Sequence, residues 1–480
     1  MRRTKIVCTL GPSSDSPDTV RRLMRTGMDV ARLNFSHGAH ATHQKLLDTV
    51  RATAAELNRN VAVMMDLQGP KIRTGVLKGG RPVELVEGET ICITTRDVPG
   101  DAACVSTTYD NLPTDVKAGD RLLLADGALE LQAEKVGPPD IQCRIVRGGM
   151  LGQHKGINLP GVAVSAPSLT EKDLKDLDFA LGAGADYVAL SFVRHPDDVR
   201  GIKQRIEETG KDTHVIAKIE RPEAIAKLDE ILELADGAMV ARGDLGVEMN
   251  LEDIPQIQKD LIARCNRLGK PVITATQMLE SMMTSARPTR AEVGDVANAI
   301  YDGTDAVMLS GETAAGKYPV RAAQVMADVA ARADEAIAAS PTRERRLAHG
   351  LPGNQHASFS SAIGRAVGHI AQEVDAKRIV CFTMSGYTAR MIARNRPGVP
   401  ITVFTLNEAT QRRCALLWGV DAMRASEVND TDEMVGVVDE LLVEHNLARG
   451  NDKVIIVAGT PLAMGGRTNL IKLHSVGEKA

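Results

Sequence analysis

The 480-residue sequence contains few aromatic side chains and no excess of positive charge. Aromatic residues make up 2% of the chain, and Trp418 is its one tryptophan. Proteins that bind nucleic acid without sequence preference stack bases on aromatic side chains in a positively charged groove. A formal net charge of −4 and a pI near 6.3 do not provide such a groove. We therefore expect no nucleic-acid partner.

Long apolar runs are absent as well. No run reaches the roughly 18 apolar residues that a membrane-spanning helix needs. The segment MRRTKIVCTLGPSS includes two arginines but lacks the apolar core of a secretory signal peptide. We therefore expect no membrane association and a cytoplasmic location.

The seven cysteines are scattered singly, without a CxxC pair. An odd number of widely spaced cysteines is typical of reduced thiols in a cytosolic protein rather than of a disulfide framework. We expect each cysteine to be a small core residue rather than a nucleophile.

Eight short apolar runs alternate with segments of mostly helical periodicity. Short runs of this kind are typical of buried parallel strands. Eight strands, each followed by a helix, predict a (β/α)8 TIM barrel. The runs are residues 5–10, 29–35, 61–67, 186–192, 214–220, 237–244, 271–277 and 305–312.

The interval between the third and fourth runs is unusually long. Up to about residue 165 it is rich in turn residues, with short β-type runs between the turns, which predicts an inserted β-barrel domain. A helix pattern then resumes the barrel, with Thr170 as its expected N-cap and Gly182 or Gly184 near its end.

The last part of the chain predicts a separate domain. An alanine-rich helix pattern extends to about Ala339, and residues 340–355 form a polar connector. Apolar and helical patterns then alternate again, as in an α/β domain. The predicted division is a barrel of residues 1–68 and 166–338, an inserted β-barrel domain of residues 69–165, and a C-terminal α/β domain of residues 339–480.

Polar and charged side chains follow most of the apolar runs. The active sites of (β/α)8 enzymes lie at the C-terminal ends of the strands, so these side chains are candidates for chemistry. They are Arg32, Asn34 and Ser36 after the second run, Asp66 after the third, Lys218 and Glu220 at the fifth, Arg242, Gly243 and Asp244 at the sixth, Thr274, Thr276 and Gln277 at the seventh, and Ser310 and Glu312 after the eighth.

Lys218 and Glu220 are the most informative pair, because residues two apart in a strand point to the same face. An ordinary ion pair is the simpler interpretation. The functional interpretation is a cation for substrate charge beside a carboxylate for a metal. Glu220 and Asp244 suit Mg²⁺ (or Mn²⁺), which takes few protein ligands. With Lys218 and Arg32 facing anionic oxygens, the set indicates phosphoryl chemistry.

Two weaker signals are a glycine-rich segment and the histidines. Residues 311–318, GETAAGKY, match the GxxxxGK pattern, but Tyr318 stands where Ser or Thr ligates Mg²⁺, so we interpret the glycines as loop residues. His37 is a candidate for nucleotide contact or an ordinary surface residue. The other histidines, including His154 and His195, have no metal-ligand spacing.

Several long segments, in the right order along essentially the whole chain, resemble the pyruvate kinase family. The resemblance implies a homotetrameric, allosterically regulated enzyme that converts phosphoenolpyruvate and ADP into pyruvate and ATP in the last step of glycolysis. The segments are KIVCTLGPSS, ARLNFSHG, DLQGPKIRTG, KGINLPG, IAKIER, VARGDLGVE, TATQMLESM and residues 287–319.

The resemblance also implies roles for the strand-end residues. Arg32 contacts the transferred phosphoryl group, and Lys218 stabilises the transition state and the enolate. Glu220 and Asp244 hold the divalent ion. The proton donor to the enolate stays open, with Thr276 and a water chain as one candidate. The residues expected around the substrate carboxylate are Gly243, Asp244 and Thr276.

The nucleotide is expected between the barrel and the inserted domain. By the resemblance, its phosphates lie near a set of residues that includes Lys155 of the inserted domain, so this domain should close over the nucleotide as a lid and exclude water. The set is Asn34, Ser36, His37, Arg73 and Lys155.

The sequence departs from the family at its monovalent-cation site. Many members bind K⁺ through an Asn, a Ser, an Asp and the next residue, commonly Thr. Asn34, Ser36 and Asp66 are present, but Leu67 replaces Thr, and Lys71 stands where K⁺-dependent relatives have Glu. We hypothesise that the Lys71 ammonium replaces K⁺, which is then not required. The alternative is a solvent-exposed lysine at the lid hinge.

In the C-terminal domain, residues 382–397 resemble a phosphate-binding loop for allosteric effectors, and residues 459–469 resemble the loop that faces it. We expect a phosphorylated effector, such as a sugar phosphate or AMP, bound by donors at a helix N-terminus. An ordinary strand-to-helix turn is the alternative. The expected donors are Thr383, Ser385, Gly386 and Thr388.

Two other functions compete with this interpretation. A Mg²⁺-dependent barrel lyase or aldolase would share Glu220 and Asp244 but would not need Arg73, Lys155 or a closing lid. A metabolite sensor with an inactive site would have lost at least one of the charged strand-end residues, all of which are present.

Overall fold

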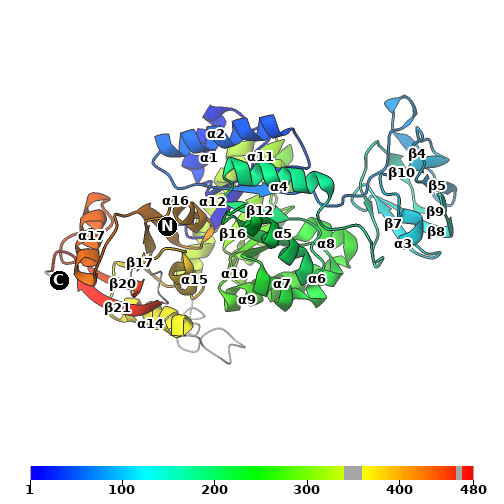
Figure 1. Ribbon diagram of the computed structural model, residues 1–480. Helices are drawn as coiled ribbons and strands as arrows, with labels where there is room; N and C mark the ends of the chain where they lie inside the picture. Colours follow the sequence, from blue (N-terminus) through cyan, green and yellow to red (C-terminus); the bar gives the residue numbers. More distant parts are fainter. Residues whose placement is uncertain (1, 340–358, 461–467, 479–480) are drawn as a thin grey trace.

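The computed structural model describes residues 2–339, 359–460 and 468–478. Figure 1 shows a helix-covered barrel in the middle, a β domain on one side and an α/β domain on the other. Within these described ranges, no helix is long and apolar enough to cross a membrane.

The central barrel is closed, and all eight strands predicted from the apolar runs are present. Their order is β1-β16-β15-β14-β13-β12-β3-β2, and each neighbouring pair is parallel. The predicted TIM barrel is thereby confirmed. The strands are β1 (Lys5–Thr9), β2 (Val30–Asn34), β3 (Ala62–Asp66), β12 (Tyr187–Leu190), β13 (His214–Ile219), β14 (Gly237–Ala241), β15 (Val272–Ala275) and β16 (Ala306–Leu309).

Alternate residues of each barrel strand contribute to two different cores. In β1, Val7 belongs to the cluster inside the barrel, whereas Ile6 and Cys8 belong to the larger cluster between the strands and the helices. Both faces of the strands are therefore buried, which explains why the runs are continuously apolar.

Helices surround the barrel. The helix expected after the insertion is α4, in which Thr170 caps the N-terminus and Gly184, in a left-handed conformation, ends the helix. The helical pattern of residues 223–235 is split into α6 and α7, because Lys227 leaves the helical conformation. The helices are α1 (Pro17–Thr26), α2 (His40–Glu56), α4 (Glu171–Ala183), α5 (Pro196–Glu208), α6 (Pro222–Ala226), α7 (Leu228–Leu234), α8 (Arg242–Glu248), η2 (Leu251–Asp253), α9 (Ile254–Leu268), η3 (Glu280–Met283), α10 (Arg290–Asp302), α11 (Gly311–Ala314) and α12 (Pro319–Ala338).

The inserted domain, which we call the lid, projects from the barrel (Figure 1). It contains a six-stranded sheet with the order β11-β7-β8-β9-β5-β6 and a two-stranded sheet of β10 and β4. Its two connections to the barrel pair with each other through a bridge between Arg73 and Gly156. The elements are η1 (Lys78–Gly80), β4 (Val83–Leu85), β5 (Thr90–Thr94), β6 (Cys104–Ser106), α3 (Leu112–Asp115), β7 (Arg121–Leu124), β8 (Leu129–Gly137), β9 (Asp140–Arg147), β10 (Gly149–Leu151) and β11 (Ile157–Asn158).

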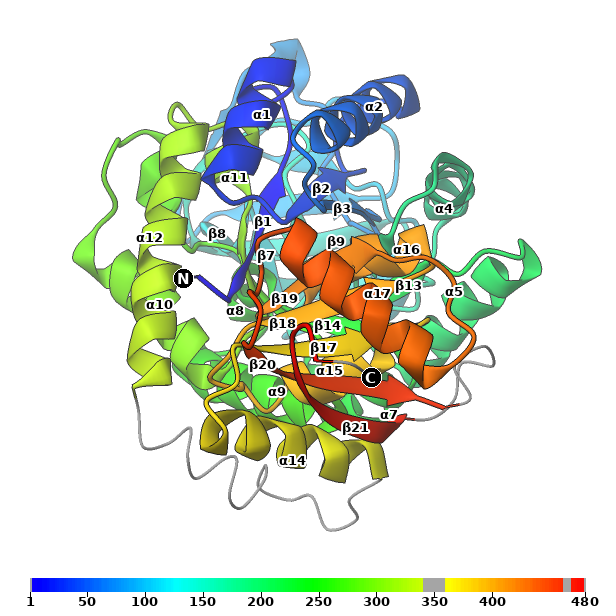
Figure 2. The ribbon, with the colours of Figure 1, turned by 90° about the vertical axis from the view of Figure 1, so that its left-hand side faces the viewer.

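The C-terminal domain contains a five-stranded sheet with the order β19-β18-β17-β20-β21, in which β21 is antiparallel to β20. Helices α14 and α15 pack on one face and α17 on the other (Figure 2). The expected connector, 340–355, and residues 461–467 of the expected facing loop lie outside the described residues. The elements are α14 (Phe359–Glu373), β17 (Arg378–Phe382), α15 (Tyr387–Ala393), β18 (Ile401–Thr405), α16 (Glu408–Arg413), η4 (Cys414–Leu416), β19 (Val420–Arg424), α17 (Thr431–Glu444), β20 (Lys453–Gly459) and β21 (Thr468–Ser475).

The C-terminal domain contacts the N-terminal ends of the barrel strands. The hydroxyl of Tyr187, at the start of β12, donates to the Arg413 carbonyl at 2.7 Å. The ammonium of Lys5, at the start of β1, donates to the Val420 carbonyl at 2.7 Å. The C-terminal ends of the strands, where the charged side chains collect, are thus left to face the lid.

Gly69 lies in the first connection between barrel and lid. Its φ is 70°, and its N–H donates to Asp173 Oδ1 at 3.0 Å. A Cβ at this position would lie 2.6 Å from Cδ2 of Phe192 and 3.1 Å from Cβ of Ser191. Glycine therefore allows the chain to turn closely against the end of β12.

We expect Gly69→Ala to lower the free energy of unfolding more than Gly79→Ala. Both glycines have positive φ, which costs an alanine about 1–2 kcal/mol. A Cβ at Gly79 meets nothing within 4 Å, whereas the overlap with Phe192 adds about 1–3 kcal/mol at Gly69. Urea denaturation measures both losses, and equal losses would contradict close packing at Gly69.

Candidate active site

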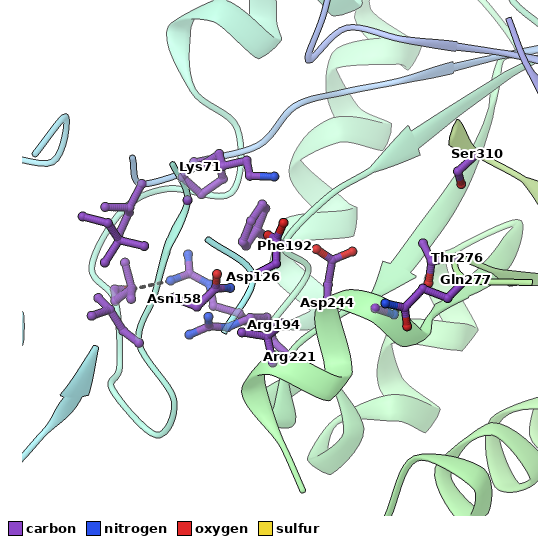
Figure 3. Close-up of a pocket in the computed structure, with 18 of the residues that line it drawn as sticks. Lys71, Asp126, Asn158, Phe192, Arg194, Arg221, Asp244, Thr276, Gln277 and Ser310 are labelled. Carbon is purple, nitrogen blue, oxygen red and sulfur yellow. Dashed lines mark hydrogen bonds between the residues drawn. The ribbon is translucent and has the colours of Figure 1, made fainter. Parts of the chain in front are cut away.

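A cavity of about 330 Å³ lies between the lid and the C-terminal ends of the barrel strands. Figure 3 shows side chains from both domains around it, and the carboxylate of Asp244 points into the space between them. The lid side includes Lys71, Asp126 and Asn158, and the barrel side includes Asp244, Thr276 and Ser310.

The ammonium of Lys218 is at the centre of a buried charge cluster. It lies 2.8 Å from Oε1 of Glu220 and 3.4 Å from Oδ1 of Asp66, and it donates to the Ser191 hydroxyl at 2.7 Å. Burial disfavours the charge, but Asp66, Glu220 and Asp244 outweigh it and raise the pKa of Lys218 above its usual range. Lys218 is therefore a cation held charged in a buried position.

Arg32 is held beside Lys218 by Asp66. Its Nε lies 2.7 Å from Oδ2 of Asp66, and its Nη1 donates to the Thr9 hydroxyl at 2.9 Å. Asp66 is 1% exposed, and although burial opposes its charge, Lys218 and Arg32 lower its pKa. The carboxylate at the end of β3 thus fixes two cations at the mouth of the barrel.

Glu220 and Asp244 form a second, anionic side of the site. Oε2 of Glu220 accepts a hydrogen bond from the N–H of Phe192 at 2.9 Å. Burial, together with the negative charge of Asp244, raises the pKa of Glu220 despite Lys218. Repulsion between these carboxylates is what a divalent cation would relieve, so the two residues fit such an ion. No group of three or more His, Cys, Asp or Glu side chains able to hold a metal occurs among the described residues.

Thr276 and Gly243 form a rigid corner of the cavity. The Thr276 hydroxyl accepts from the N–H of Gly243 and donates to the Ala275 carbonyl, both at 2.7 Å. Thr276 has a φ of 65°, a strained conformation for a β-branched residue. Arg242 stabilises it by donating to the Thr276 carbonyl at 2.9 Å, and Arg242 is itself paired with Asp295 at 2.7 Å.

The residues expected at the nucleotide lie outside the 330 Å³ cavity, on both sides of the gap between barrel and lid. Oδ1 of Asn34 accepts from the N–H of Ser36 at 3.1 Å. His37 is exposed, and its pKa is lowered by partial burial and by the charges of Arg73, Lys71 and Arg32.

Within the lid, Arg73 and Lys155 belong to the two paired connections. Nη1 of Arg73 donates to the His154 carbonyl at 3.0 Å, and the N–H of Thr74 donates to the Lys155 carbonyl at 2.8 Å. The structure therefore brings Arg73 close to His37 and to the Lys155 segment. Among the described residues, no hydrogen bond or ion pair joins the Lys155 side chain to the barrel.

Lys71 lines the cavity, and Figure 3 shows its ammonium beside Phe192. Among the described residues, its side chain has no hydrogen bond or ion pair, and so none with Asn34, Ser36 or Asp66. A positive charge without a partner in a cavity is available to an anionic ligand.

The sequence did not reveal a set of contacts between lid and barrel. Nη1 of Arg221 lies 2.6 Å from Oε1 of Glu248, and Nδ2 of Asn158, in the lid, donates to the same oxygen at 3.1 Å. Nη1 and Nη2 of Arg194 both donate to carbonyls near the second lid connection, those of Val164 and Ala166. Arg221 directly follows the fifth run, and Arg194 lies two residues after the fourth. These positions were the signal that the sequence offered.

The expected effector loop joins β17 to α15. The Thr383 hydroxyl accepts from the N–H of Gly386 at 3.2 Å, and Ser385 is exposed. Hydroxyls of Thr388 and Thr468 lie 2.8 Å apart, which places this loop beside the start of β21. The four expected donors are thus together at one end of the sheet.

Comparison with known proteins agrees with the fold. The family description "Pyruvate kinase, barrel domain" matches residues 1–323, and "Pyruvate kinase, alpha/beta domain" matches residues 361–474. Pyruvate kinase from Geobacillus stearothermophilus is 47% identical over 99% of this chain and 81% of its own length. Pyruvate kinase from Staphylococcus epidermidis is 45% identical over 100% of this chain and 81% of its own length.

A solved structure shows the same agreement in three dimensions. The crystal structure of a pyruvate kinase from Cryptosporidium parvum superimposes with a TM-score of 0.92 at 40% identity, covering 99% of this chain and 96% of the other. Two family descriptions, relatives that match over essentially all of this chain, and a matching structure lead to one conclusion. The chain belongs to the pyruvate kinase family and is a phosphotransferase.

Proposed function

We propose that the enzyme transfers the phosphoryl group of phosphoenolpyruvate to ADP at the cavity between barrel and lid. Arg32 contacts the transferred group, and Lys218 stabilises the charge of the transition state and of the enolate. The observation that carries the proposal is the buried cluster in which Asp66 holds both cations at fixed positions. Preorganised charge of this kind is usually the largest catalytic contribution. Pyruvate formation, followed by a coupled dehydrogenase assay, tests the activity.

Glu220 and Asp244 are the proposed ligands of Mg²⁺ or Mn²⁺. When bound, the ion would neutralise charge on phosphoryl, carboxylate and enolate oxygens. The raised pKa of Glu220 means that its carboxyl stays protonated to a higher pH than usual. Since a ligand must be deprotonated, we propose that metal binding strengthens as the pH rises through this range.

The substrate carboxylate is proposed to bind at the corner formed by Gly243, Asp244 and Thr276. The Thr276 hydroxyl is already committed to the Ala275 carbonyl. A hydroxyl is also a weak acid, so we propose that Thr276 orders a water chain that protonates the enolate, rather than giving up its own proton.

ADP is proposed to bind between His37 on the barrel and Arg73 on the lid, with Asn34, Ser36 and Lys155 near its phosphates. The lowered pKa of His37 keeps this side chain neutral near pH 7. Closure of the lid would bring Lys155 toward the barrel and exclude water that would otherwise hydrolyse the phosphoryl donor. The contact from Asn158 to Glu248 supports a lid that can touch the barrel on this side of the cavity. We retain residues 69–165 as the proposed limits of the lid and 339–480 as those of the C-terminal domain.

Lys71 is proposed to supply the positive charge that K⁺ supplies in other members of the family. The support is its position on the cavity wall without an ion-pair partner among the described residues. Asp66, a member of the expected K⁺ site, already contacts Lys218 and Arg32, which leaves it little capacity for another cation.

We expect Lys71→Glu to convert a K⁺-independent enzyme into one that K⁺ stimulates. The wild type should be equally active in tetramethylammonium and potassium buffers, whereas the variant should lose activity by about 10²-fold without K⁺, as for loss of one stabilising charge. The exposed lid residue Lys117 provides a control, because Lys117→Glu changes net charge equally. Strong K⁺ stimulation of the wild type would contradict the proposal.

The C-terminal domain is proposed to bind a phosphorylated effector and to take part in a homotetramer. Hydroxyl and amide donors of Thr383, Ser385, Gly386 and Thr388 around the start of α15 support an anion site. Replacing Ser385 by Asp places a negative charge there, and we expect it to abolish activation by a sugar phosphate or AMP while basal turnover persists. Activation curves measure this effect. Activation equal to that of the wild type would exclude the loop as the effector-binding site.

A further inference from the structure

Two of the seven cysteines lie side by side in the lid. Strands β5 and β6 pair in parallel, and Cys92 is the register partner of Cys104. Neighbouring strands are about 4.8 Å apart, which is within the roughly 4.4–6.8 Å between Cα atoms that a disulfide requires. The backbone therefore already holds the two residues at a bridgeable separation.

Both side chains point to the same face of the sheet. Ile91, Ile93 and Val105 alternate with the two cysteines and belong to the lid core. Because side chains alternate along a strand, Cys92 and Cys104 lie on the outer face. The closeness of Cys104 contributes to the raised pKa of the Cys92 thiol.

The third lid cysteine, Cys143, is separated from this pair by the sheet. It is part of the lid core and is fully buried. Burial raises its pKa to about 12. Cys143 is thus an internal control for thiol chemistry in the same domain.

The two paired thiols differ in accessibility. Cys104 is partly exposed, so a small disulfide can reach its thiol. Cys92 is 8% exposed, and burial together with Cys104 raises its pKa to about 12. This asymmetry assigns the first reaction to Cys104 and the second to Cys92.

We propose that Cys92 and Cys104 are a redox site that a small-molecule disulfide oxidises to an intrachain disulfide in the folded lid. The Cys104 thiolate attacks the small disulfide, forming a mixed disulfide and releasing one small thiol. Cys92 then loses its proton and attacks the Cys104 sulfur, which forms the Cys92–Cys104 bond and releases the second small thiol. Two protein thiols are oxidised, and one small disulfide is reduced to two thiols.

The position of the pair connects it to the proposed nucleotide side of the lid. Strand β6 continues into residues that pair with the first lid connection, where the N–H of Gly75 donates to the Ser106 carbonyl at 2.9 Å. The N–H of Arg73 donates to the Thr108 hydroxyl at 3.0 Å. Cys104 lies two residues before Ser106 and four residues before Thr108, so oxidation adds a covalent bond close to the segment that supports Arg73.

The test uses the native full-length enzyme and oxidised glutathione. We expect the number of free thiols to fall from seven to five, and peptide mapping to find Cys92 joined to Cys104. Dithiothreitol should restore all seven thiols. Closure should accelerate as the pH rises, because Cys92 must lose its proton.

Variants separate this site from general thiol oxidation. Cys92→Ser should keep a stable glutathione adduct on Cys104, whereas Cys143→Ser should form the same disulfide as the wild type. An unchanged thiol count, a glutathione adduct that persists on Cys104 in the wild type, or a disulfide between other cysteines would each overturn the proposal.

Discussion

Lys218→Met is expected to lower the turnover of pyruvate formation by about 10³-fold, the upper range for loss of one preorganised stabilising group. The ammonium is within 3.4 Å of two carboxylates and is kept charged by them. Methionine has a similar length but cannot stabilise developing negative charge. The effect should appear mainly in kcat, because the charge that Lys218 stabilises is greatest in the transition state.

The matched control for this variant is Lys227→Met. Lys227 is an exposed lysine at the break between α6 and α7, where it pairs with Glu230 at 3.3 Å. Its replacement removes the same charge from the chain without touching the cavity, so turnover should stay within about twofold, as for other surface changes. Equal turnover of Lys218→Met and the wild type would remove Lys218 from the catalytic assignment.

Asp244→Asn is expected to weaken Mn²⁺ binding by more than about 100-fold, since loss of even a hydrogen-bond partner of a metal ligand costs about 10–100-fold. Asp244 lies in the first turn of α8 and points into the cavity. The variant retains the size of the side chain and loses its charge. The electron paramagnetic resonance signal of free Mn²⁺ measures the affinity directly.

The same variant should also change the pH dependence of binding. Asp244 is one cause of the raised pKa of Glu220, and removing its charge lowers that pKa. Residual Mn²⁺ binding should therefore persist to a lower pH than in the wild type. Glu252→Gln, at an exposed position in η2, removes one carboxylate without altering the cavity. If Asp244→Asn and Glu252→Gln bind Mn²⁺ equally well, Asp244 is not a ligand.

The barrel was predictable because its strands are buried on both faces. Each strand therefore appears as a continuous apolar run, and the order of the runs gives the order of the strands. Fewer elements of the C-terminal domain were predictable from the sequence. Strand β19 has exposed Asp421 and partly exposed Met423 within its five residues, so it lacks a continuous apolar run. Helix α16 has only six residues, too few to show a period.

The charged centre of the site was predictable for a different reason. Lys218 and Glu220 are two residues apart in one strand, so the sequence alone places them on one face. The ion pairs of Asp66 with Arg32 and Lys218 connect three strands. No residue spacing along the chain predicts such contacts. The same holds for the contact from Asn158 to Glu248, which joins residues 90 positions apart.

The backbone strain at Thr276 was also hidden in the sequence. A β-branched residue has no local preference for positive φ. The conformation depends on hydrogen bonds from Arg242, a residue that the sequence assigned only to the end of the sixth run. Tertiary contacts of this kind override local propensity at functional sites.

The most direct test of the proposed chemistry measures ATP and pyruvate together, in one reaction of the wild-type enzyme with phosphoenolpyruvate, ADP and Mg²⁺. Transfer at a water-excluding site predicts equal amounts of the two products and no formation of either after a chelator removes the divalent ion. Pyruvate formed in excess of ATP, or turnover unaffected by the chelator, would contradict a metal-dependent phosphoryl transfer from phosphoenolpyruvate to ADP at the site formed by Lys218, Glu220 and Asp244.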